Sequence, residues 1–285
     1  MSAFFTYRAI FFSLISLIGL MVVPTAYAKE KSHPVSVEMG SVAMDVPAEM
    51  VRRLTPLTKY ISLKTGLNVT FRASPNLASA VDDLGAGSTQ IAYLTPVAYI
   101  EAHEKYGAIP LVSPLTRGKS TFNLMIVVKK DSAIKTTRDL VGKKFAFGDK
   151  KALLQQAVVV NSGVKLEDFS GYAYLNHYDN IAKAVLNEDF DAGILKDSVM
   201  EKFEPQGLRV LYTSPPLASY LFAVSSKLPA KTSRKIKNAL LELKPDTPEN
   251  KEILSILDPG YDGFATAGDQ DYNVIRKLIA AFHKK

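Results

Sequence analysis

The order of strand-type and helix-type segments is the feature that most constrains the fold of this chain. Val35–Met39 alternates apolar and polar residues, which is typical of a strand. Apolar residues then recur at spacings of three and four from Asp45 or Pro47 until Gly66, which indicates a helix. The alternation continues, with strands expected at 68–72 and 90–95 and helices at 77–84 and 96–106. Short connections between such segments predict an α/β protein whose sheet is mostly parallel.

The same alternation returns in the middle of the chain and predicts a second α/β unit. The strands expected from there onward cover 122–128, 144–148, 172–175, 190–195, 208–212 and 219–224. The expected helices cover 152–160, 178–187, 230–243, 248–257 and 270–282, with a brief helix after the capping-box spacing of Thr136–Asp139. A length of 285 residues agrees with about two domains.

We expect the chain to leave a first lobe near Phe122 and to return to it near Tyr220. The first lobe then comprises residues 29–121 plus 222–285, and the second lobe comprises residues 122–221. Two crossings between two α/β lobes make a hinge, and a cleft between such lobes is a favoured place for a ligand.

The first 28 residues have the pattern of a secretory signal peptide. Arg8 is followed by an apolar run over residues 9–23, and Ala26 and Ala28 occupy the small-residue positions of a cleavage site. The alternative is a membrane anchor, but the run is shorter than the roughly 20 residues needed to span a bilayer. We therefore expect cleavage after Ala28 and export to the periplasm of a Gram-negative bacterium.

Composition excludes several kinds of site. The chain has no cysteine, so disulfides, thiolate metal sites and a lipid-anchored cysteine are ruled out. Its four histidines are scattered without a pair at helical spacing, which argues against a metalloenzyme. No nucleophile elbow, zinc-protease helix, P-loop or dinucleotide fingerprint occurs, so we expect neither catalysis nor a cofactor.

The net charge of +7 raises the question of a nucleic-acid partner. Lysine and arginine are densest in 227–244 and 276–285, where apolar residues at helical spacing interrupt them. That pattern is typical of solvated helix faces rather than of a surface with interleaved aromatic side chains. We therefore expect no nucleic-acid partner, although a mild positive field assists the capture of an anion.

A series of short motifs runs in order through nearly the whole chain after the leader. They are Pro56–Tyr60, Gln90–Tyr99, Lys130–Ile134, Asp139–Asp149, His177, Ala184–Asn187, Phe190–Gly193, Leu228–Pro229 and Ala239–Leu241. These motifs resemble the PhnD-type substrate-binding proteins of phosphate, phosphite and phosphonate ABC transporters. The resemblance implies a type 2 periplasmic-binding-protein fold with a hinge and an inter-lobe cleft. It also implies a monomeric, non-catalytic receptor that closes on a solute and delivers it to a membrane permease.

The resemblance also implies which residues face the ligand. Tyr93, Thr95 and Tyr99 occupy family positions at a strand end and a helix start, with core packing as the alternative for the two tyrosines. His177 matches a histidine that helps to bind the anion, although a histidine there can simply cap a helix. Asp191 matches an acidic cleft residue, with termination of a strand as its alternative.

Two stretches depart from the family pattern. Where phosphonate binders have Ser-Thr-Ser-Gly, this chain has Ala152, Leu153, Leu154 and Gln155, preceded by Lys150. The hydroxyl groups that help to grip an anion are thereby lost, whereas the backbone N–H groups at the helix start are kept. The loop after the first strand is also apolar, and its ligand-facing residues are expected to be Val42 and Met44.

These departures lead to a hypothesis about the ligand. We expect a larger or more apolar solute, such as a lipid-like molecule with a polar head. The alternatives are a phosphate, phosphite or phosphonate ligand of an ABC importer, or a sensor protein that signals to a membrane kinase.

Overall fold

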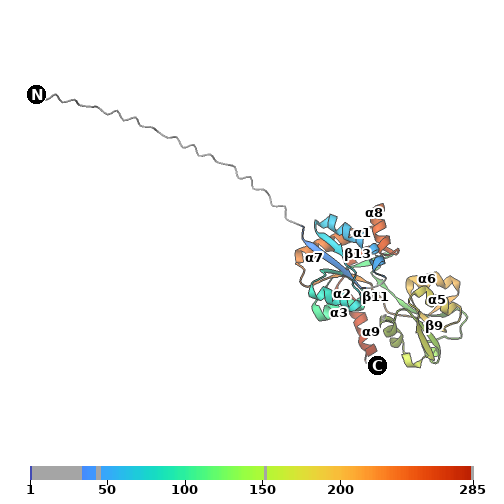
Figure 1. Cartoon of the computed structure of the whole chain (residues 1–285). Coiled ribbons are helices and arrows are strands. Elements are labelled where there is room, and N and C mark those ends of the chain that lie inside the picture. The colour runs from blue at the N-terminus through green and yellow to red at the C-terminus, as the bar shows by residue number, and fades with distance from the viewer. Residues whose placement is uncertain (2–33, 43–45, 151–152, 284–285) are drawn as a thin grey trace. The chain divides into compact units, whose positions relative to one another are not determined.

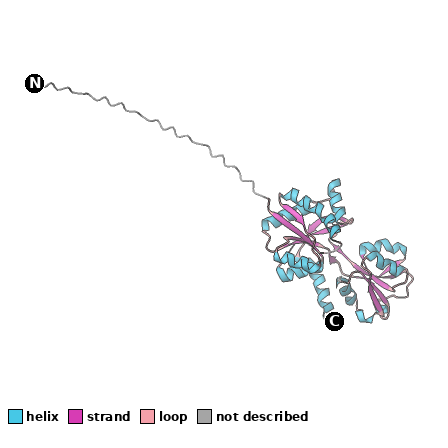
Figure 2. Cartoon of the chain, viewed as in Figure 1, coloured by secondary structure: helices cyan, strands magenta, loops and turns pink. Residues whose placement is uncertain are grey.

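The computed structural model contains two larger β-sheets, each with helices on both faces (Figures 1 and 2). It describes Met1 and residues 34–42, 46–150 and 153–283. The predicted leader, Met44 and Ala152 lie outside the described residues, so those predictions stay untested by the fold. Among the described residues, no helix is long and apolar enough to cross a membrane.

The first sheet has six described strands in the order β13-β4-β12-β3-β1-β2. Their bounds are β1 Ser36–Ser41, β2 Asn68–Phe71, β3 Ile91–Leu94, β4 Ile109–Thr116, β12 Leu221–Val224 and β13 Tyr261–Thr266. The helices that cover it are α1 Pro47–Thr65, α2 Leu77–Ala86, α3 Pro96–Tyr106, α7 Ala230–Glu242 and α8 Pro248–Leu257. We call this sheet with its helices the first lobe.

The second sheet has five described strands in the order β10-β6-β9-β7-β8. Their bounds are β6 Leu124–Lys129, β7 Lys144–Phe147, β8 Gly171–Tyr174, β9 Ala192–Lys196 and β10 Leu208–Thr213. Helices α4 Leu153–Asn161, α5 Tyr178–Leu186 and α6 Asp197–Phe203 cover it. Short 3-10 turns lie at Thr137–Leu140, Leu166–Asp168 and Glu204–Gln206. We call this sheet with its helices the second lobe.

A two-stranded antiparallel ribbon lies in the chain between the two sheets. It pairs β5 Thr121–Phe122, on the way out of the first sheet, with β11 Leu217–Ala218, on the way back. Because the returning strand runs opposite to the departing one, β12 enters the first sheet antiparallel to both β3 and β4. The prediction of a mostly parallel sheet is therefore wrong: β1 runs parallel to β2 and β3, but β12 and β13 add antiparallel pairs.

Local signals explain most of the boundaries. Helix α1 ends where Gly66 adopts a left-handed conformation with φ 70°, which a glycine tolerates without strain. Helix α3 begins at Pro96, and the side chain of Thr95 accepts a hydrogen bond from the Ala98 N–H at 3.2 Å. The capping box at Thr136 is present and starts a 3-10 turn.

The structure departs from the predicted elements at several places, among them strand β4, where no strand is expected from the sequence. The single strand expected over 122–128 is two strands, because Asn123 leaves the ladder and its side chain donates to the Ser214 carbonyl at 2.8 Å. The short helix α6 and strand β13 were not expected. Strand β13 has a register shift and Gly263 at φ 143°, which removes the alternation that reveals a strand.

The buried apolar residues form three clusters that follow the sheet faces. One lies between the first sheet and α1, α7 and α8, and another lies between the second sheet and α5 and α6. The third runs from the α2 and α3 face of the first sheet to the α4 face of the second. Helix α9 Asn273–His283 joins this third cluster and packs against α4, so it contacts both lobes.

Candidate functional site

Two tyrosine hydroxyls of the first lobe meet where β3 ends and β13 begins. Tyr93, the third residue of β3, is buried and its hydroxyl oxygen lies 2.6 Å from that of Tyr261 at the start of β13. The Tyr93 ring stacks on Phe222 with centroids 4.7 Å apart and lies 5.6 Å from the ring of Tyr220. These contacts fix the position of the Tyr93 ring, and within the hydroxyl pair one O–H donates to the oxygen of the other.

The second lobe contributes a polar arrangement around Gln155. This residue of α4 is 5% exposed. Its Oε1 accepts from the Gly148 N–H at 2.7 Å, and its Nε2 donates to the Tyr178 hydroxyl at 3.2 Å. Gly148 directly follows β7, and Tyr178 is the first residue of α5.

Electrostatic coupling connects the two groups of tyrosines. Burial raises the pKa of Tyr178, and the neighbouring Tyr220 raises it further. Burial also raises the pKa of Tyr220; the Arg53 guanidinium opposes this shift, and the Asp258 and Asp149 carboxylates add to it. The phenol of Tyr178, in the second lobe, is thus electrostatically coupled to that of Tyr220, which precedes the first-lobe strand β12.

The phenols of this group are protonated at neutral pH. Burial raises the pKa of Tyr93 and of Tyr261 as well, each from an ordinary value of 10.0. A neutral phenol donates a hydrogen bond, whereas a phenolate would repel an anion. Tyr93, Tyr178, Tyr220 and Tyr261, which we call the tyrosine cluster, thus present hydrogen-bond donors beside the positive charge of Arg53.

Several predicted site residues lie elsewhere or serve another purpose. Tyr99 is fully buried, and its hydroxyl donates to Asp269 at 2.8 Å, so it belongs to the packing of α3 rather than to the tyrosine cluster. Thr95 caps α3 and is half-buried. Asp191 accepts from the Lys144 N–H at 2.8 Å at the amino end of β7 and β9. Because Gly148 lies at the carboxyl end of β7, Asp191 and Gly148 lie at opposite ends of this strand, and a ligand contact of Asp191 stays a prediction.

His177 and Lys150 are close in the chain to the residues around Gln155: His177 precedes Tyr178, and Lys150 follows Gly148 by two residues. His177 is exposed at the residue before α5, and its side chain makes no capping hydrogen bond, so the simple capping alternative is not what the structure shows. Lys150 is exposed, and its carbonyl accepts from Gln156 at 3.4 Å.

The apolar residues of the two departing stretches point into cores. Leu154 is 8% exposed and Val42 is 2% exposed, and both belong to the apolar cluster shared by the two lobes. Leu153 is half-buried. The expectation that these side chains make a ligand cleft apolar therefore loses its physical basis for Leu154, whereas Val42 also borders a cavity of the first lobe.

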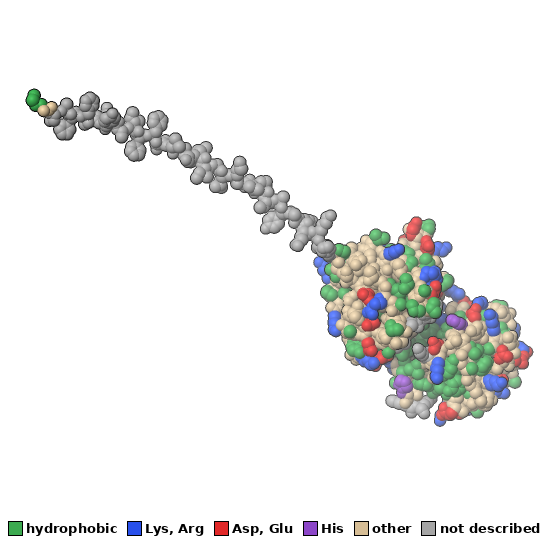
Figure 3. Space-filling model, viewed as in Figure 1, with side chains coloured by type: hydrophobic (Ala, Val, Ile, Leu, Met, Phe, Trp, Pro, Cys, Tyr) green, Lys and Arg blue, Asp and Glu red, His purple; other side chains and the backbone are tan. Residues whose placement is uncertain are grey.

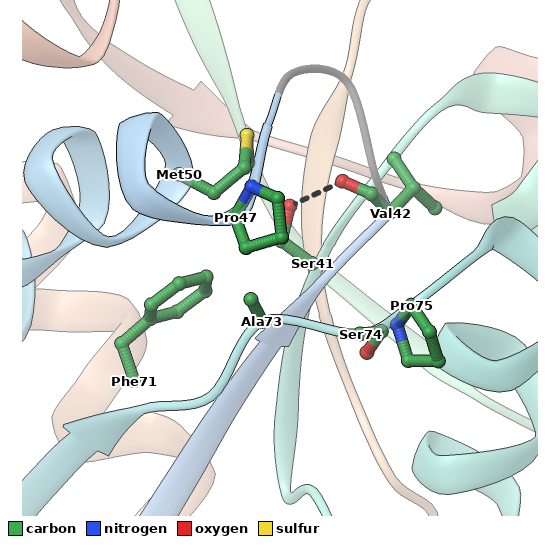
Figure 4. A pocket seen from close by; sticks show the side chains of 8 residues that line it. All are labelled: Ser41, Val42, Pro47, Met50, Phe71, Ala73, Ser74 and Pro75. Atoms are coloured by element: carbon green, nitrogen blue, oxygen red, sulfur yellow. Dashed lines mark hydrogen bonds between the residues drawn. The ribbon is translucent and has the colours of Figure 1, made fainter.

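A cavity of about 100 Å³ lies at the carboxyl ends of β1 and β2, beside the start of α1 (Figure 4). Side chains of Pro47, Met50, Phe71 and Ala73 gather around it, and Val42 lies at its edge. Ser41 donates to the Val42 carbonyl at 2.8 Å. The tyrosine cluster does not line this cavity, so the two are separate features of the first lobe.

Neither the surface charge nor the His, Asp and Glu side chains of the described residues indicate a second kind of binding site. On the face drawn in Figure 3, lysine and arginine side chains are interspersed with aspartate and glutamate. In the part of the chain that the structure describes, no group of three or more His, Asp or Glu side chains is placed to hold a metal ion.

The comparisons with known proteins agree with this architecture. Residues 39–272 match the sequence family described as "ABC transporter, phosphonate, periplasmic substrate-binding protein". A relative named phosphate-import protein PhnD, from Mycolicibacterium smegmatis, is 23% identical over 229 residues, which cover 73% of this chain and 71% of the relative.

Two solved structures show the same fold. PhnD1 from Prochlorococcus marinus, in complex with methylphosphonate, has a TM-score of 0.70 at 18% identity and covers 89% of this chain and 100% of its own. XAC2383 from Xanthomonas citri, bound to ATP, has a TM-score of 0.71 at 17% identity, with coverages of 87% and 97%. The two-lobed fold of type 2 periplasmic binding proteins, expected from the sequence, is confirmed.

Proposed function

The chain belongs to the family of periplasmic substrate-binding proteins of phosphonate ABC transporters, and on that premise we propose that it binds phosphate or a small phosphonate between its lobes. Proteins of this family deliver a ligand to a membrane permease and are described as binding proteins rather than enzymes. The proposal includes export after cleavage at Ala28 and hinged lobes of residues 29–121 plus 222–285 and 122–221.

The observation that carries this proposal is the tyrosine cluster. Its hydroxyls come from both lobes and are kept protonated by burial, so they donate to an anion without repelling it. The guanidinium of Arg53, whose Nε donates to the Leu257 carbonyl at 3.0 Å, supplies positive charge that lowers the pKa of Tyr220 and Tyr261, whereas the Asp258 carboxylate raises both. Hydrogen bonds to an ionised acceptor are stronger than those between neutral groups, which suits phosphate and phosphonate oxygens.

The larger apolar ligand is the weaker alternative. It rested on apolar residues in two stretches; among those that the structure describes, Val42 and Leu154 are buried in the core and Leu153 is half-buried. Among the similar proteins, the names of a phosphate-import protein and of a methylphosphonate complex state a phosphorus oxyanion, and XAC2383 was solved with ATP. A phosphate, phosphite or phosphonate ligand, first weighed as the alternative, is therefore our proposal.

Isothermal titration calorimetry tests the proposal directly. The protein, purified from the periplasm and dialysed free of phosphate, is titrated with inorganic phosphate, methylphosphonate and, as a control anion, methanesulfonate. We expect saturable binding of phosphate or methylphosphonate in the micromolar range and weaker binding of the singly charged sulfonate. Binding of a fluorescent fatty-acid analogue together with no heat from either phosphorus oxyanion would favour the apolar ligand instead.

A further inference from the structure

Gln155 is a buried amide in an otherwise apolar part of α4. Its neighbours Leu154, Ala157 and Val158 are buried among apolar side chains. Burial of a side-chain amide is costly unless its hydrogen bonds are made. Here both ends are satisfied, by the Gly148 N–H at 2.7 Å and by the Tyr178 hydroxyl at 3.2 Å.

Gly148 lies at the end of a strand where a ligand is expected to bind. Ligands in α/β proteins bind at the carboxyl ends of parallel strands, where peptide N–H groups point out of the sheet. Gly148 follows β7, which runs parallel to both β8 and β9. Its N–H is a donor at the edge where an oxyanion would accept a hydrogen bond, but Oε1 of Gln155 already accepts from it.

The amide also lies directly over the glycine. A Cβ built on residue 148 would lie 2.7 Å from Nε2 and 3.1 Å from Oε1 of Gln155. The three atoms nearest to that position all belong to the Gln155 carboxamide, which therefore packs against Gly148. The side chain therefore covers the donor as well as bonding to it.

We propose that Gln155 determines ligand specificity by occupying, with its own carboxamide, the acceptor position beside Gly148 and Tyr178. The inference rests on the proposed binding of a phosphorus oxyanion. With the carboxamide in place, a small anion gains no hydrogen bond from the Gly148 N–H and relies on the other hydroxyls of the tyrosine cluster. Gln155 thus lowers the affinity for phosphate and small phosphonates relative to a site in which Gly148 is uncovered.

Two alanine variants test this role against a merely structural one. Gln155→Ala uncovers Gly148 and keeps a helix-forming residue. Gln156→Ala is the matched control, because Gln156 lies next to it on α4 and also bonds to a tyrosine, Tyr174, at 3.1 Å. We expect Gln155→Ala to bind methylphosphonate about tenfold more tightly than the wild type, the effect of one hydrogen bond to a charged acceptor. Gln156→Ala should bind as the wild type does.

An NMR measurement reports directly on the backbone N–H of Gly148. In Gln155→Ala, the backbone amide resonance of Gly148 should shift on titration with methylphosphonate or inorganic phosphate. In the wild type and in Gln156→Ala the same resonance should move little, because the Gly148 N–H already donates to Oε1 of Gln155. The isosteric variant Gln155→Glu, which puts a negative charge at this position, should lose anion binding.

The outcomes separate the inference from the proposed function. If the wild type binds methylphosphonate and Gln155→Ala binds it no more tightly, with no shift at Gly148, the inference is wrong and the proposed function stands. If the wild type shows no binding but Gln155→Ala binds, the inference holds in its strongest form. If no variant binds either phosphorus oxyanion, both are overturned.

Discussion

Tyr93 and Tyr261 are 168 residues apart in the chain, yet their hydroxyl oxygens are 2.6 Å apart. Tyr93 is 2% exposed, so its hydroxyl has little access to water and depends on this partner. The pair therefore stabilises the meeting of β3 and β13 as well as offering a donor to a ligand. Its energetic role is separable from its binding role by substitution of each tyrosine in turn.

We predict that Tyr261→Phe lowers the free energy of unfolding by about 1–3 kcal/mol, because it leaves the buried hydroxyl of Tyr93 without a partner. The double variant Tyr93→Phe with Tyr261→Phe should lose less than the sum of the two single losses, since it removes both polar groups. Urea denaturation of the three variants measures the coupling. Additive losses would mean that the hydroxyl pair contributes nothing of its own.

Helices α3 and α9 are joined at their ends by a polar group centred on Asp269, in the 3-10 turn Asp269–Tyr272 that precedes α9. The carboxylate accepts from Tyr99 at 2.8 Å and forms an ion pair with Arg276. His103 of α3 lies 3.6 Å away. Although burial opposes ionisation, Arg276 and Tyr99 hold the pKa of Asp269 below its ordinary value.

This lowered pKa predicts a pH dependence of stability. A carboxyl group whose pKa is lower in the folded state contributes stability above its unfolded pKa of about 4 and loses that contribution as the pH falls through its folded pKa. Asp269→Asn should therefore flatten the acid limb of the stability curve below about pH 4. Urea denaturation between neutral and acid pH measures this, with Asp271→Asn compared in parallel. Equal acid limbs for Asp269→Asn and the wild type would contradict the prediction.

At the scale of the whole molecule, one apolar cluster extends through both lobes. It includes Leu94 of β3, Ile126 of β6 and Leu154 of α4. Helix α9 is part of it: Leu278 is 8% exposed, and its carbonyl accepts from the side chain of Asn161 at 3.2 Å. The C-terminal helix thus ties the two lobes together beside the ribbon of β5 and β11.

We predict that Leu278→Ala lowers the free energy of unfolding by about 2–4 kcal/mol, because the truncated side chain leaves a cavity between α9 and α4. Lys277→Ala, the exposed neighbour on the same helix, should change it by less than about 0.5 kcal/mol. Chemical denaturation of both variants makes the comparison. Equal stability of the two variants would show that the packing of α9 against α4 does not stabilise the protein.

The sequence by itself determined the local elements, because their signals are local. Pro96 with Thr95 marks a helix start, Gly66 marks a helix end, and the order of strands and helices predicts an α/β fold. It also identified the family, since short motifs keep their order along the chain. It could not predict the direction of β12, which depends on how the chain returns through β11.

Only the tertiary structure decided which side chains meet. The hydroxyl of Tyr93 bonds to that of Tyr261, and the carboxamide of Gln155 accepts from the Gly148 N–H. Asp191 accepts from the Lys144 N–H, at the opposite end of β7 from Gly148. Residue type and family position do not encode these outcomes, because the direction of a side chain follows from packing against elements distant in the chain. Gln155 shows this most clearly: the sequence revealed an altered residue, and the structure revealed the hydrogen bonds that it takes up.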